Sequence, residues 1–108
     1  MRRTRIAVAT SFPADPATPH GGVEAVSVNL VRWLARYDDL DIHVVTTQPG
    51  VSTVEVSDWA GATIHRLPWA SRRVLRHATG PGRRAVSAYL QQLGADLVHA
   101  HEIGRAHV

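Results

Sequence analysis

The first third of the chain combines a short apolar run, a proline-rich loop, a pair of glycines and a helical pattern, in that order. Residues 5–10 are apolar on both faces, which favours a buried strand of a parallel sheet. Three prolines exclude regular structure from residues 11–22, which end at Gly21-Gly22. Residues 23–36 then predict a helix whose buried stripe consists of Val23, Val26, Leu30, Trp33 and Leu34.

The same kind of alternation continues along the chain. Residues 42–47, 62–67 and 96–100 are rich in apolar and β-branched side chains and predict further strands. Residues 51–56 fit an edge strand or an extended loop, followed by a turn over residues 57–61.

A second helix is predicted over residues 83–93, after a break at Gly80-Pro81-Gly82. Gly94 follows the helix at the position where a glycine commonly ends one. The buried face of this helix is expected to hold Val86, Tyr89, Leu90 and Leu93.

Strands that alternate with helices predict an α/β fold with a parallel sheet. Because crossovers are right-handed, we expect a Rossmann-like, doubly wound sheet with residues 96–100 on the far side of the first strand. The strand order then reverses between these two strands, and ligands of open α/β sheets bind at such a reversal. Gly21, Gly22 and His101 should therefore all lie at that crevice.

The length, composition and charge of the chain exclude some structural classes and argue against others. The 108 residues form one domain at most, and the absence of cysteine excludes disulfides and thiolate metal sites. The net charge of +3 is modest and does not indicate a nucleic-acid partner. No apolar run approaches the roughly 20 residues that span a bilayer, and the run after the basic start is too short for a signal peptide. We therefore expect a cytoplasmic protein.

The glycine pair is the first candidate site. A helix start leaves backbone N–H groups unpaired and carries the positive end of the helix dipole, and Gly21 and Gly22 would let a diphosphate approach them closely. The segment is neither a Gly-x-Gly-x-x-Gly fingerprint nor a Walker loop. The alternative is a plain helix start at which Glu24 favours the dipole.

The histidines form the second candidate site. His99 and His101 alternate along the last predicted strand and share a face. Such a pair can bind zinc, but no further ligands stand at a recognisable spacing, so we predict no metal site. We expect His99 to be buried and hydrogen-bonded to the backbone, and His101 to be the site residue. His43 and His65 have no partner at a recognisable spacing.

Arginines cluster after the strand at 62–67, with apolar residues between them. The cluster fits either a solvated basic face or a contact with anionic lipid or an anionic acceptor. The residues assigned to this acceptor or membrane contact are Arg72, Arg73 and Arg76.

Taken together, these segments resemble the N-terminal, acceptor-side domain of a family 4 glycosyltransferase with the GT-B fold. Each motif is degenerate, but their order and separation are specific, and the resemblance extends to about residue 102. It is carried by RIAVA at 5–9, HGGVE at 20–24, IHVVT at 42–46, IHRLP at 64–68 and DLVHAH at 96–101.

The resemblance implies a retaining transferase that moves a sugar from a nucleotide-diphosphate-sugar donor to an acceptor hydroxyl. Gly21 and Gly22 would lie against the donor diphosphate, and His101 would be the catalytic residue near the transferred sugar or the acceptor. No cofactor and no tightly bound metal are implied, since the nucleotide sugar is a co-substrate.

The acceptor in this family is lipid-linked in some enzymes, and a small metabolite is the other expectation here. A lipid acceptor would give the arginine cluster a role in peripheral contact with the inner face of the membrane. The family's second, nucleotide-binding domain is missing from this sequence, so we expect the fragment alone to be inactive.

Two other functions stay open. One is a Rossmann-like domain of another enzyme class, such as an oxidoreductase, against which the missing Gly-x-Gly-x-x-Gly speaks. The other is a non-enzymatic module that binds a nucleotide or a sugar.

The end of the chain is expected to be non-native. Residues 102–108 can be back-translated into a string that, after its first base, matches a common short-read sequencing adapter. We therefore expect residues 1–102 to be a truncated glycosyltransferase domain and residues 103–108 to be adapter read-through. Residue 102 would then owe only its first base to the gene.

Overall fold

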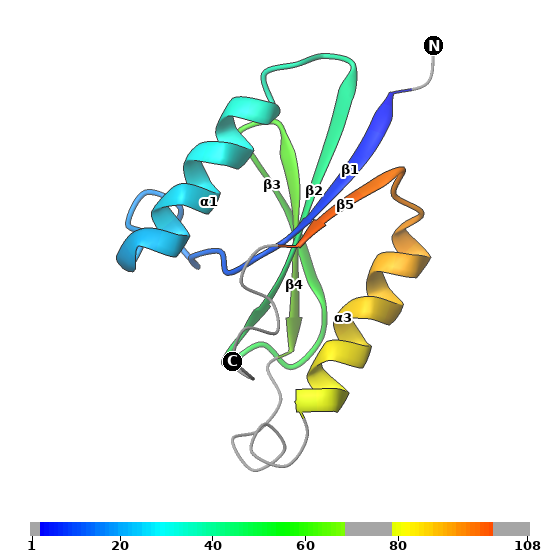
Figure 1. Cartoon of the computed structure of the whole chain (residues 1–108). Coiled ribbons are helices and arrows are strands. Elements are labelled where there is room, and N and C mark those ends of the chain that lie inside the picture. Colours follow the sequence, from blue (N-terminus) through cyan, green and yellow to red (C-terminus); the bar gives the residue numbers. More distant parts are fainter. Residues whose placement is uncertain (1–2, 69–78, 101–108) are drawn as a thin grey trace.

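The structure is a computed structural model that describes residues 3–68 and 79–100 (Figure 1). Strands and helices follow one another largely as the sequence pattern predicts. In chain order the elements are β1 (Thr4–Ala9), α1 (Gly21–Leu34), β2 (Leu40–Gln48), β3 (Glu55–Trp59), β4 (Ala62–Pro68), α3 (Thr79–Leu93) and β5 (Leu97–Ala100).

The five strands form one sheet in the order β3-β4-β2-β1-β5. All neighbours are parallel except β3 and β4, which form an antiparallel hairpin at one edge. Ala9 of β1 is paired with Val45 on one side and with Ala100 on the other. The expected position of the last strand beside the first is confirmed, and the strand order reverses at β1.

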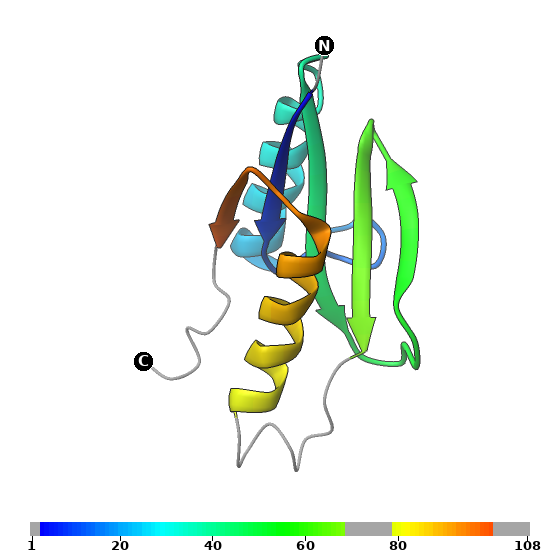
Figure 2. The same cartoon turned by 90° about the vertical axis from the view of Figure 1, so that its right-hand side faces the viewer.

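The two helices cover opposite faces of the sheet (Figure 2). The α1 face buries one apolar cluster, and Val86 of α3 belongs to a second cluster on the other face. Tyr89, Leu90 and Leu93 pack against this second cluster, so the predicted buried face of α3 is confirmed. The first cluster consists of Phe12, Val28, Val31, Ile42, Val44, Ala62 and Ile64, and the second of Ala9, Val45, Leu67 and Val86.

The predicted buried stripe of α1 is wrong for Val23, Val26 and Trp33, which are exposed, whereas Leu34 packs against the α1-side cluster as predicted. Val26 and Trp33 are 56% and 55% exposed, whereas Val28 and Val31 are 3% and 0% exposed. The helix carries apolar residues on two neighbouring stripes, and the stripe with the smaller side chains faces the sheet. Short side chains let the helix approach closely, and the polar Ser27 on this stripe finds a buried partner in the loop that follows β1.

Two boundaries also differ from the prediction. Residues 80–82 belong to the first turn of α3 rather than to a break. Proline is tolerated in a first turn because N–H groups there have no acceptor within the helix, so the missing N–H of Pro81 costs no hydrogen bond. Residues 51–56 are expected to form an edge strand or an extended loop, but the strand here is β3, at residues 55–59. The turn predicted over residues 57–61 is limited to the two residues Ala60-Gly61. Both turn residues have positive φ, 51° and 89°, as a type I′ hairpin requires.

No helix within residues 3–68 and 79–100 is long and apolar enough to cross a membrane. The arginine cluster Arg72, Arg73 and Arg76, the expected catalytic His101 and the tail at 103–108 lie outside the described residues.

The two valines of α1 test which stripe is buried. Val31→Ala should lower the free energy of unfolding by about 2 kcal/mol, because it removes two methyl groups from a close-packed site. Val26→Ala, the matched control on the same helix, should change it by less than about 0.5 kcal/mol. Chemical denaturation measures both, and equal losses would contradict the orientation of α1.

Candidate functional site

The candidate site lies at the carboxyl ends of the parallel strands, which we call the strand-end edge of the sheet. The arrowheads of β1, β2, β4 and β5 point toward this edge, and the first turn of α1 begins beside it (Figure 2). Residues 10–20 leave β1 at the point where the strand order reverses and lead directly into that turn. The sequence predicts a ligand site at this place in an open α/β sheet.

The first part of this loop is fixed by buried hydrogen bonds. Thr10 Oγ1 lies 2.7 Å from Ser27 Oγ of α1, and the Thr10 N–H donates to Val45 O over 3.2 Å. The Phe12 N–H donates to Thr46 Oγ1 over 3.3 Å, and the Phe12 ring, 4% exposed, belongs to the α1-side core. The loop is therefore joined to β2 and to α1 before it reaches the glycines.

Arg66 of β4 holds the middle of the loop. Its Nη2 donates to the carbonyl oxygens of Pro13 and Ala14 over 3.1 and 3.4 Å, and its Nη1 donates to Ser57 Oγ of β3 over 3.2 Å. Desolvation lowers the pKa of Arg66, and the charge of Glu55 opposes this change. A single guanidinium thus joins the hairpin to the loop, and sequence reasoning assigned it no role.

The start of α1 is left open. Gly21 has φ +87°, a conformation that L side chains rarely adopt, and a Cβ at Gly21 or Gly22 would meet no heavy atom within 4 Å. The helix has no side-chain cap, although the His20 N–H donates to Glu24 Oε1 over 2.7 Å. Among the described residues, no side chain caps the first N–H groups of the helix, and no atom outside the helix lies within 4 Å of where a Cβ would stand at either glycine.

The last strand brings the chain to the same edge but is not buried. All four residues of β5 are exposed, so the prediction that His99 is buried is wrong. Leu97 and Val98 are 58% and 46% exposed, because β5 is an edge strand and only β1 pairs with it in the described part of the chain. The structure therefore does not test whether the expected catalytic residue, His101, approaches the glycines.

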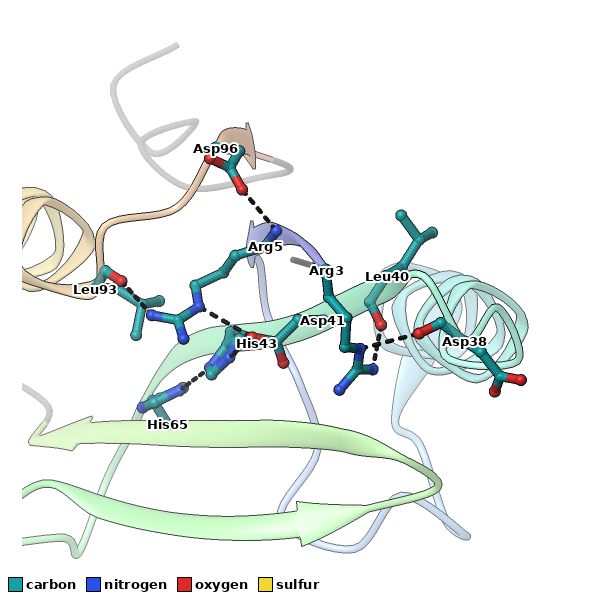
Figure 3. Close-up of polar contacts among 9 residues, drawn as sticks. All are labelled: Arg3, Arg5, Asp38, Leu40, Asp41, His43, His65, Leu93 and Asp96. Carbon is teal, nitrogen blue, oxygen red and sulfur yellow. Dashed lines mark hydrogen bonds and ion pairs between the residues drawn. The ribbon is translucent and has the colours of Figure 1, made fainter. Parts of the chain in front are cut away.

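Sequence reasoning missed a second polar group, a row of side chains on the α3 face of the sheet. Figure 3 draws three of its members, Asp41, His43 and His65. Asp41 Oδ2 lies 3.1 Å from His43 Nε2, and His43 Nδ1 lies 2.8 Å from His65 Nε2. His65 Nδ1 lies 2.6 Å from the Tyr89 hydroxyl. We call Asp41, His43, His65 and Tyr89 the polar row.

Arg5 anchors one end of the polar row. Its Nε donates to Asp41 Oδ2 over 3.0 Å, and its Nη1 donates to Leu93 O, at the end of α3, over 2.8 Å. The backbone N–H of Arg5 donates to Asp96 Oδ2 over 2.8 Å. Arg5 therefore ties β1 to β2, to the end of α3 and to the residue before β5 (Figure 3).

The environment of the polar row shifts the pKa of three of its groups. Burial, followed by the charges of His43 and Arg5, lowers the pKa of His65 to about 4. Burial alone would raise the pKa of Asp41, but hydrogen bonds and charges from His43 and Arg5 outweigh it, so the pKa of this carboxyl is lowered. Burial raises the pKa of Tyr89. Asp41 is thus ionised and His65 neutral near pH 7.

Metal ligands do not gather in the described part of the chain. Within residues 3–68 and 79–100, no group of three or more His, Cys, Asp or Glu side chains is placed to hold a metal ion. The two histidines of the polar row use their facing nitrogens for each other.

The two glycines differ in backbone conformation, and this difference can be measured. Gly21→Ala should lower the free energy of unfolding by about 1–2 kcal/mol, because its positive φ places a Cβ in a strained position. Gly22→Ala should be neutral or stabilise the fold by up to about 1 kcal/mol. Alanine has less backbone freedom than glycine in the unfolded chain and therefore loses less conformational entropy when the helix forms. Thermal or urea unfolding measures both, and an equal effect of the two substitutions would contradict this difference.

Comparison of the chain with protein-family models, with curated proteins and with solved structures found no match. A functional conclusion therefore depends on the residues themselves, on the motifs they form and on the geometry of the strand-end edge.

Proposed function

We propose that this chain is the acceptor-side, N-terminal domain of a retaining glycosyltransferase of the GT-B type, similar to family 4. The mostly parallel sheet with a helix on each face is compatible with the Rossmann-like, doubly wound domain of such an enzyme. The complete enzyme would transfer a sugar from a nucleotide-diphosphate-sugar donor to an acceptor hydroxyl.

The observation that carries the proposal is the open, uncapped start of α1 at the strand-end edge. Within the part of the chain that the structure describes, Gly21 and Gly22 leave space within 4 Å of their missing side chains, and no side chain caps the helix. An anion is the ligand that such a helix start favours. The diphosphate of a nucleotide sugar has this chemistry.

The same geometry suggests how catalysis would be assisted. A nucleotide diphosphate gains negative charge as the bond to the sugar breaks, and preorganised backbone N–H groups stabilise that charge. The buried loop contacts of Thr10 and Phe12 would keep those groups in place without reorganisation. The role of the helix start is therefore electrostatic.

The remaining roles follow the resemblance alone. His101 would act near the transferred sugar or the acceptor, and Arg72, Arg73 and Arg76 would contact an anionic acceptor or the inner face of the membrane. No cofactor is needed, and the donor nucleotide would be held by a second domain. The chain by itself would then be inactive and would reside in the cytoplasm.

Gly22→Val tests the diphosphate site in the full-length enzyme. The branched side chain should block close approach of the diphosphate and lower turnover at least tenfold, about 1.4 kcal/mol in the transition state. Sugar transfer is measured with the native donor. Asn29→Val, which places the same residue on an exposed part of α1, is the control and should leave turnover unchanged.

Unchanged turnover in Gly22→Val would overturn the role of the glycines. Loss of activity in both variants would point instead to a general effect of valine on the helix, and circular dichroism of each variant detects it.

The chain alone offers a second test of the ligand class. In an NMR titration, UDP and GDP should shift the backbone amides of residues 21–24 at millimolar concentration, and Gly22→Val should abolish the shifts. Weak binding is expected because only the phosphates would be contacted. Tight binding of NAD would favour an oxidoreductase and contradict the proposal.

A further inference from the structure

The polar row joins three elements through four side chains. It runs from Asp41 and His43 of β2 across His65 of β4 to Tyr89 of α3, with 3.1, 2.8 and 2.6 Å between successive polar atoms. The planes of the two imidazole rings are inclined by 26°, with centroids 5.1 Å apart. His65 hydrogen-bonds through both nitrogens, whereas His43 does so through Nδ1 and holds Nε2 at ion-pair distance from Asp41 without hydrogen-bond geometry. The helix α3 contacts the sheet through a hydrogen bond as well as through apolar packing.

We propose that the polar row attaches helix α3 to the sheet in a pH-dependent way. The row accepts one proton by reversing its hydrogen bonds, and it releases the helix when a second proton binds. The inference depends only on the contacts within the row and is independent of the proposed glycosyl transfer.

The resting arrangement follows from counting donors and acceptors. An ionised carboxylate only accepts, so His43 must carry its proton on Nε2, facing Asp41. Nδ1 of the same ring is then bare and accepts the Nε2–H of His65. Nδ1 of His65 is bare in turn and accepts the Tyr89 hydroxyl proton. With both rings neutral, the N–H groups of His43 and His65 and the O–H group of Tyr89 all point toward Asp41, through two hydrogen bonds and the 3.1 Å ion-pair contact.

One added proton reverses the row without breaking it. A hydronium ion gives a proton to His65 Nδ1, so that an O–H bond breaks and an N–H bond forms. The Nε2 proton of His65 then passes to His43 Nδ1, so that one N–H bond breaks and another forms. His43 becomes an imidazolium beside the Asp41 carboxylate, and His65 stays neutral. The Tyr89 oxygen changes from donor to acceptor, and its own proton turns away.

A second proton has no place in the row. Both rings would then be cations, and two N–H groups would face each other across 2.8 Å. Among the side chains that the structure describes, the charged groups around them are Arg5 of β1 and Asp41 of β2, and Arg5 already forms an ion pair with that carboxylate. The neutral Tyr89 of α3 cannot balance the additional charge. The two cations repel each other and need water, and His65, 6% exposed, lies between the sheet and α3. Water reaches the two rings when α3 moves away from the sheet, so the helix is the element that is released.

The pKa of His65 sets the direction of the pH effect. In the unfolded chain His65 titrates near 6.5, and in the folded chain only at about 4. Between these values the unfolded state binds more protons, so stability falls as pH decreases from 6.5 to 4 and does not change through this group above 6.5. The folding equilibrium constant should change by up to about tenfold per pH unit.

Release should begin at α3 because, among residues 3–68 and 79–100, the other face of the sheet has no buried histidine. The core beneath α1 is an apolar cluster joined by the Thr10–Ser27 hydroxyl pair. The α3 face has a smaller buried apolar cluster beside the polar row. Acid therefore weakens the attachment of one helix and leaves that of the other intact.

Hydrogen exchange and histidine NMR test this inference on the chain as it is. Between pH 8 and pH 4.5, the protection factors of residues 85–93 should fall at least tenfold more than those of residues 27–34. At pH 8, the ring nitrogens of His43 and His65 should both report a proton on Nε2. A proton on Nδ1 of either ring, or simultaneous loss of protection in both helices, would overturn the proposal.

The double variant His65→Leu/Tyr89→Phe removes the hydrogen bond that attaches α3 to the polar row, and it leaves no unpaired buried hydroxyl. In this variant the protection of residues 85–93 should not change relative to that of residues 27–34 over the same pH range. A persistent selective loss would assign the effect to another group and overturn the proposal. If the variant does not fold, the ring-nitrogen and exchange measurements on the unsubstituted chain decide the question.

Discussion

β1 has hydrogen-bonded strands on both of its edges, and the arrangement of the other elements follows from this constraint. The connection through α1 leads to β2 on one side, and the connection through α3 returns to β5 on the other. Right-handed crossovers that run in opposite directions place their helices on opposite faces of the sheet. The loop after β1 therefore opens where the strand order reverses, and the start of α1 opens with it.

The two faces of the sheet are held by different physical means. Beneath α1, small β-branched side chains pack closely, and two hydroxyl groups satisfy each other. Beneath α3, fewer apolar residues are buried, and hydrogen bonds through His43, His65 and Tyr89 supply part of the contact. Burial of apolar surface is insensitive to pH, whereas a row of imidazoles depends on its protons. This difference couples α3, and the strand that follows it, to the solution conditions.

Much of the candidate site was visible in the sequence. Glycines after a proline-rich loop predicted the start of a helix at the end of the first strand, and the structure has α1 begin at Gly21. Arg66 could not be predicted, because its contacts with Pro13 and Ala14 span more than 50 residues. The row from Asp41 to Tyr89 could not be predicted either, because its members come from three elements.

The sequence by itself determined the order of strands and helices, the apolar face of α3 and the need for glycine at the start of α1. These properties are local. Backbone geometry sets the side-chain periods of 2.0 residues in a strand and 3.6 in a helix, and it allows few residue types other than glycine at positive φ. Only the tertiary structure decided which stripe of α1 is buried and which histidines meet. His43 and His65 are 22 residues apart, and the register of β2 against β4 brings them together. Register depends on the packing of whole faces, which no single segment encodes.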